Sequence, residues 1–111
     1  MSEATEQQKV VEWCDWNRVP VYHVPNGGHR SAKEAYFLKL SGVKPGVPDL
    51  CIPEPRGHYH GLYIELKVGK NKLSENQRHW IYELNKRGYK AAVCYGASAA
   101  VAEIKSYLAL E

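Results

Sequence analysis

The feature that most constrains the fold of this 111-residue chain is a helix with two well-marked ends, flanked by two short apolar stretches. Residues 62–68 and 90–95 are typical of buried strands, and residues 74–87 place apolar side chains at helical spacing. Ser74 stands where a helix N-cap is expected, and Gly88 where a C-cap glycine is expected. The order strand, helix, strand predicts a parallel pair of strands joined by a right-handed crossover.

A further strand is expected just before this segment. Residues 49–52 follow a rigid turn and end at Pro53, so they should form an antiparallel hairpin with residues 62–68. Three more helices and a short strand are predicted from periodicity, over residues 4–17, 32–40, 98–108 and 19–24. We therefore expect one domain over residues 1–111, an α/β fold with a mixed sheet flanked by helices.

The composition restricts the class of protein. Hydrophobic residues make up 44% of the chain and charged residues 24%, as in ordinary globular domains. The apolar runs are too short to span a membrane, and the acidic, polar N-terminus is unlike a secretory or transit peptide. We expect a cytoplasmic protein with no membrane partner. A zinc site from Cys51, His58 and His60 is the weaker alternative, because paired ligand spacings are missing.

Charge is distributed unevenly along the chain. Residues 56–90 contain eight Lys or Arg and three Glu, whereas residues 1–17 contain four acidic residues and one Lys. A basic region beside embedded carboxylates suits a protein that binds phosphates and holds a cation. On charge alone, an ordinary solvated surface explains the pattern at least as well.

Three residues of the expected hairpin carry the chemistry. Glu65 and Lys67 share one face of their strand, with Cα atoms about 6.6 Å apart, and Asp49 can approach Glu65 from the neighbouring strand. Carboxylate oxygens are the ligands that Mg²⁺ prefers, and a bound cation activates water and polarises a phosphoryl oxygen. Lys67 can orient the attacking water or offset charge in the transition state. This grouping predicts phosphodiester hydrolysis.

Three runs in this order resemble the virus-type replication-repair nuclease (VRR-NUC) domain of the PD-(D/E)XK nuclease superfamily. They are Gly-Val-Pro-Asp-Leu at 46–50, Tyr-Ile-Glu-Leu-Lys at 63–67, and Ser-x-x-Gln-x-x-Trp at 74–80. The resemblance covers nearly the whole chain and implies a restriction-endonuclease-like fold. It also implies a Mg²⁺- or Mn²⁺-dependent DNA endonuclease acting on branched DNA, such as Holliday junctions or flaps. A phage, viral or bacterial origin is expected, and the residues alone do not separate DNA from RNA as substrate.

The resemblance also assigns roles to individual residues. By it, Asp49 and Glu65 bind the metal together with the backbone carbonyl of Leu66. Lys67 is the catalytic lysine, and Gln77 lies beside the active centre. Gln77 also fits a capping box at the start of its own helix, but we favour the functional role because Gln77 begins the inward face of that helix.

The family also places a glutamate early on the first helix. Glu3 is the best match, with Glu6 second and Glu12 third, although a carboxylate there stabilises a helix N-terminus in any case. The residues that we expect to contact DNA are basic and lie in loops: His29, Arg30, Lys70 and Lys72.

The segment from Trp13 to Val24 holds more apolar groups than a small core readily absorbs, and it contains a possible edge strand. We therefore expect a homodimer with this segment in its interface, in line with small members of the family. Two alternatives remain for the function. The chain could be a nucleic-acid-binding module without turnover, or an interaction domain whose carboxylates only cap and bridge.

Overall fold

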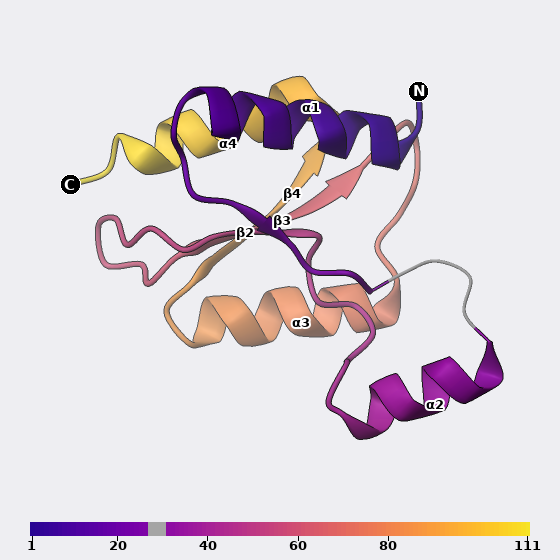
Figure 1. Cartoon of the computed structure of the whole chain (residues 1–111). Helices are drawn as coiled ribbons and strands as arrows, with labels where there is room; N and C mark the ends of the chain where they lie inside the picture. The colour runs from indigo at the N-terminus through magenta and orange to yellow at the C-terminus, as the bar shows by residue number, and fades with distance from the viewer. Residues whose placement is uncertain (27–30) are drawn as a thin grey trace.

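The structure is a computed structural model that describes residues 1–26 and 31–111. A four-stranded sheet lies between two layers of helix, with α1 and α4 on one face and α3 on the other (Figure 1). The helix α2 lies at the margin of the molecule and buries none of its residues. In chain order the elements are α1 (Glu3–Trp16), β1 (Tyr22–His23), α2 (Ala32–Leu40), β2 (Leu50–Ile52), β3 (Leu62–Lys67), α3 (Glu75–Lys86), β4 (Lys90–Tyr95) and α4 (Ala97–Leu108).

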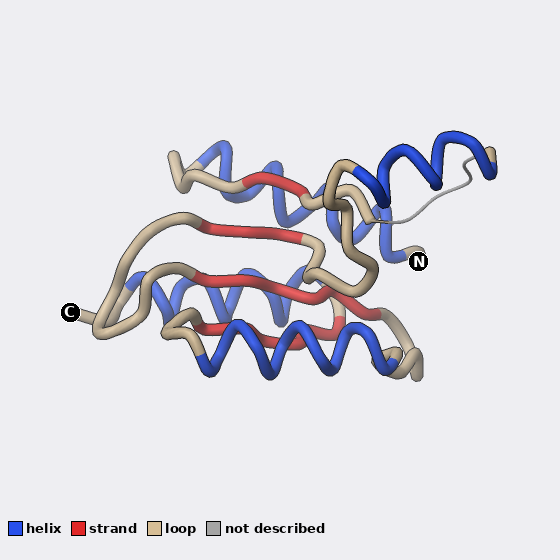
Figure 2. Tube along the Cα trace, turned by 90° about the horizontal axis from the view of Figure 1, so that it is seen from below, coloured by secondary structure: helices blue, strands red, loops and turns tan. Residues whose placement is uncertain are grey.

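The sheet has the order β1-β2-β3-β4, and Figure 2 shows its strands side by side. The strands β2 and β3 pair antiparallel with Leu50 opposite Ile64, and β3 pairs parallel with β4 with Glu65 opposite Val93. Both the expected hairpin and the expected crossover are therefore confirmed. Because β3 and β4 are parallel, their C-terminal ends lie at the same edge of the sheet.

The hydrophobic core lies between the sheet and the helices α1 and α4. Alternate residues of β3 point into it, namely Leu62, Ile64 and Leu66, and all three are fully buried. The other face of β3 is turned towards α3, where Tyr63 lines a cavity with Trp80 and Leu84. Glu65 and Lys67 alternate with the core residues, so they belong to the face that α3 covers.

The strand expected over residues 19–24 is much shorter than predicted. Val19 is buried, and its amide donates to the carbonyl of Cys14, so it completes the end of α1 instead of entering the sheet. Arg18 takes a positive φ of 57° in this turn, and Pro20 has no amide hydrogen to give to a ladder. Only Tyr22 and His23 pair with β2.

The three cysteines are free and buried, and within the described residues no group of His, Cys, Asp and Glu is arranged as a zinc site. None of the helices in the described part of the chain has the length and apolar character needed to cross a membrane.

Candidate active site

Asp49 is held at the start of β2 by contacts on three sides. Its carboxylate Oδ2 accepts a hydrogen bond of 2.8 Å from the amide of Leu66, on the neighbouring strand. Its carbonyl oxygen accepts a bond of 2.8 Å from the amide of Val24 and lies 2.9 Å from Nδ1 of His23. The side chain of Asp49 therefore lies across the hairpin from Glu65, as the sequence predicted.

The turn before Asp49 packs directly on the first turn of α3. Gly46 has a φ of 93°, and a Cβ at this position would lie 2.5 Å from the carbonyl carbon of Asn76. Asn26 adds a second restraint, since its Nδ2 donates to the carbonyl of Val47 at 2.8 Å. A residue with a side chain at position 46 would force Asp49 and α3 apart, which gives the glycine of this motif a physical reason.

Glu65 and Lys67 are both buried, with exposed fractions of 2% and 7%. Burial raises the pKa of Glu65 to about 8, helped by the charge of Asp49 and a hydrogen bond with the Asp49 carboxyl, while the charge of Lys67 acts in the opposite direction. Two carboxyl groups thus share one confined place, where a single nearby ammonium does not supply enough positive charge for both to ionise at neutral pH.

This shortage of positive charge is the observation that tests whether a divalent cation fits. Such a cation prefers oxygen ligands and would relieve the repulsion between the two carboxylates. The donors at hand are the oxygens of Asp49 and Glu65, so the residues fit Mg²⁺ or Mn²⁺. Among the described residues, no group of three or more His, Cys, Asp or Glu side chains is arranged to hold a metal. A carbonyl such as that of Leu66, water and substrate would have to supply further ligands.

Gln77 performs both of the tasks that the sequence offered as alternatives. Its Oε1 accepts from the amide of Ser74 at 2.9 Å, which closes the capping box of α3. Its Nε2 donates to Oε2 of Glu65 at 3.3 Å. The two ends of one amide therefore connect the first turn of α3 to the carboxylate on β3.

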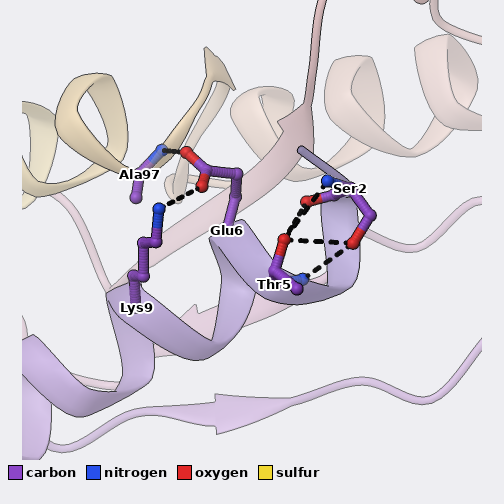
Figure 3. A network of polar contacts seen from close by, with 5 residues as sticks. All are labelled: Ser2, Thr5, Glu6, Lys9 and Ala97. Carbon is purple, nitrogen blue, oxygen red and sulfur yellow. Dashed lines mark hydrogen bonds and ion pairs between the residues drawn. The ribbon is translucent and has the colours of Figure 1, made fainter.

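The three glutamates of α1 are placed very differently. Glu3 is near enough for its negative charge to raise the pKa of Glu65 slightly, and its Oε2 accepts from Nδ2 of Asn71 at 3.0 Å. Glu12 is exposed and contacts Gln8. Glu6 is buried between Lys9 and the start of α4, and both of these contact its carboxylate (Figure 3). Of the three, Glu3 is the one beside the candidate site.

The predicted DNA contacts are divided between described and undescribed segments. Lys70 and Lys72 are exposed on the loop between β3 and α3, next to the site. Tyr95 anchors this loop, because its hydroxyl donates to the carbonyl of Asn71 at 2.7 Å. The other two predicted contacts, His29 and Arg30, lie outside the described residues.

The sequence did not reveal the structural contacts that Glu6, Asn71 and Tyr95 make. For Glu6 a signal was present, because it stands four residues before Val10 and eight before Cys14, on the helical stripe that is buried. A carboxylate on such a stripe needs a partner inside the protein. No comparable pattern marks Asn71 or Tyr95, whose contacts depend on how the loop folds back.

Comparison with known proteins agrees with this geometry. The family model described as the VRR-NUC domain matches residues 1–98. A Fanconi-associated nuclease 1 homolog from Oryza sativa subsp. japonica is 36% identical over 76 residues, which cover 64% of this chain and 8% of that protein. A solved structure described as a VRR-NUC domain protein superposes with a TM-score of 0.82 at 33% identity, covering 99% of this chain and 90% of the other.

Proposed function

Because this chain belongs to the VRR-NUC family of nucleases, we propose that it is a metal-dependent DNA endonuclease that hydrolyses phosphodiester bonds in branched DNA. The observation that supports this most directly is the buried pair of carboxylates, Asp49 and Glu65, with Lys67 next to them on the same face of β3. A solvated surface pair would not carry so high a pKa, and a buried group whose pKa is shifted by both burial and a specific charged partner is typical of functional sites.

The cation would be held by Asp49 and Glu65, with the carbonyl of Leu66 and the carboxylate of Glu3 as further candidates. When bound, Mg²⁺ or Mn²⁺ supplies an activated water molecule and polarises the scissile phosphate. The protein holds the donors in place beforehand: the Leu66 amide orients Asp49, and Gln77 orients Glu65. Such preorganisation removes most of the cost of arranging ligands during the reaction.

Lys67 supplies the positive charge that the reaction requires on the protein side. It is buried at 7% exposure and lies on β3 two residues after Glu65, so it shares the face of the carboxylates. Its ammonium can orient the attacking water or offset the charge that grows on the phosphate oxygens. Lys70 and Lys72, on the exposed loop that follows, suit contacts to the DNA backbone on either side of the cut.

The proposed substrates are branched DNA such as Holliday junctions and flaps, and the proposed assembly that cuts them is a homodimer. A four-way junction has two-fold symmetry, which two identical centres at a fixed separation match. Support for an interface between Trp13 and Val24 comes from Trp16 and Tyr22, which are 88% and 51% exposed, and from β1 at the edge of the sheet. Val19 does not contribute, since it is buried in the core of its own chain.

The test is cleavage of a panel of junction, flap, duplex and single-stranded DNA, with RNA counterparts, in Mg²⁺ and in Mn²⁺. We expect cleavage of branched DNA that excess EDTA stops. Asp49→Ala and Glu65→Ala should each abolish cleavage while the circular dichroism spectrum stays that of the folded protein. Activity that persists in EDTA would contradict the metal requirement. Binding of DNA without turnover under every condition would show a non-catalytic module.

A further inference from the structure

Glu6 is a buried carboxylate that the proposed chemistry does not use. Its side chain is 6% exposed, and both of its oxygens are occupied. The Oε1 atom accepts from the amide of Ala97 at 3.0 Å, and Oε2 accepts from Nζ of Lys9 at 2.8 Å (Figure 3). The bond to Ala97 joins residues 91 positions apart in the sequence and is itself buried.

The helix α4 has no cap of its own, and this explains what Glu6 does there. Its N-cap residue is Gly96, which has no side chain to accept a bond from the first turn. Position 96 also has a φ of 89°, where a residue with a side chain would be strained. Helix N-termini favour negative charge, so a carboxylate from α1 satisfies an amide that the local sequence leaves open.

The same turn is attached to the end of β3 that bears the lysine. The amide of Gly96 donates to the carbonyl of Lys67 at 2.9 Å, and Lys67 stands opposite Tyr95 in the parallel pairing of β3 and β4. The turn between β4 and α4 is therefore held by Glu6 on one side and bonded to Lys67 on the other. A displacement of this turn would therefore also displace the backbone of Lys67.

We propose that Glu6 is a positioning residue for the nuclease centre, which caps α4 from α1 and thereby fixes the backbone of Lys67. Glu6 is not a metal ligand in this arrangement, because both of its oxygens already have partners within the protein. Its effect on turnover rests on the nuclease function proposed above, but its effect on the turn does not.

The experiment compares Glu6→Ala with Glu6→Gln and with Val10→Ala. Glu6→Gln keeps an oxygen that can accept from Ala97, so it should rescue most of the loss. Val10 is fully buried on the same face of α1, one turn further on, and its apolar side chain cannot cap α4; Val10→Ala is therefore the control for stability alone. Lys9→Gln removes the ion pair and leaves the cap in place.

Two readouts are needed, both well below the unfolding temperature. The first is the NMR chemical shifts of the Gly96 amide and the Lys67 carbonyl, which need no activity. The second is kcat and KM on the best DNA substrate, together with Mn²⁺ affinity by calorimetry. For Glu6→Ala we expect both shifts to move and kcat to fall at least about tenfold, since small misplacements at a centre are costly. KM and Mn²⁺ affinity should stay within about threefold of wild type, as should kcat in Val10→Ala.

Three results would overturn the proposal. They are a kcat for Glu6→Ala equal to that of Val10→Ala, unmoved shifts at Gly96 and Lys67, or a loss of Mn²⁺ affinity that makes Glu6 a ligand. A wild-type protein that cleaves nothing would instead refute the proposed function, and the chemical shifts would still decide whether Glu6 holds the turn.

Discussion

The close approach of Gly46 to α3 makes a quantitative prediction, because the chain contains a matched control. Gly42 and Gly46 have similar φ angles, of 104° and 93°. A Cβ at Gly42 would have nothing within 4 Å, whereas a Cβ at Gly46 would lie 2.5 Å from the Asn76 backbone. Comparing Gly42→Ala with Gly46→Ala therefore separates backbone strain from the contact between the turn and the helix.

The magnitude follows from these two terms. A left-handed backbone costs an alanine about 1–2 kcal/mol at either position, partly offset by the lower entropy of the unfolded chain. At Gly46 the turn and α3 must also separate by about 0.9 Å to reach the 3.4 Å at which ordinary contact begins. Overpacking of this kind costs roughly 1–3 kcal/mol. We expect Gly42→Ala to lose about 1 kcal/mol and Gly46→Ala about 2–4 kcal/mol.

Thermal and urea unfolding of the two variants, followed by circular dichroism, measures the difference. For a domain of this size, each kcal/mol lowers Tm by about 4 °C. Gly46→Ala should also lose turnover while still folded, because the contact it breaks sets Asp49 against the first turn of α3, which carries Gln77. Equal losses of stability in the two variants would refute the close packing of the turn on α3.

Three further predictions concern chemistry, burial and assembly. Lys67→Ala should lower kcat by about a hundredfold or more, because the charge of Lys67 acts on the transition state. The affinity for DNA, measured in Ca²⁺, should change little. A collapse of affinity with turnover preserved at saturation would show that Lys67 is only a phosphate contact. Burial raises the pKa of the Cys14 and Cys94 thiols to about 11 from an ordinary 9.0, with smaller contributions from nearby acids. The thiols stay neutral in the folded protein, so their contribution to the free energy of unfolding should be constant below pH 9 and fall between pH 9 and 11. Measured with urea, the free energy of unfolding should therefore fall less steeply between pH 9 and 11 in the Cys14→Ala/Cys94→Ala variant than in the wild type. Light scattering at micromolar concentration should report twice 12.6 kDa, and Trp16→Glu or Tyr22→Glu should give monomers; a wild-type monomer that still makes paired cuts would refute the dimer alone.

The residues of the carboxylate pair were predictable because strand geometry has a strict period of two. Once β3 was recognised, Glu65 and Lys67 had to share a face, and the hairpin placed Asp49 opposite Glu65. The long helices and β4 were equally predictable, since capping residues and glycines mark their ends. These features depend only on residues that are near one another in the sequence.

The parts that could not be predicted depend on contacts between distant segments. The buried stripe of α1 contains Glu6 as well as Val10 and Cys14, because the helix packs against both α4 and β3. The strand expected from residue 19 failed for a similar reason, as Val19 is drawn into the core at the end of α1. Periodicity defines an apolar face but not the neighbour that will cover it.

The position of the candidate site follows from where three helices begin. Since β3 and β4 are parallel, α3 and α4 both start near the same edge of the sheet, and the first turn of α1 lies there too (Figure 1). Each first turn carries a partial positive charge that favours nearby carboxylates. At α4 that charge is matched by Glu6, and at α3 the Gln77 amide reaches Glu65. The pKa of Glu65 is nevertheless raised, because burial and the charge of Asp49 outweigh the charge of Lys67. The demand for positive charge that remains at this edge is what a divalent cation would meet.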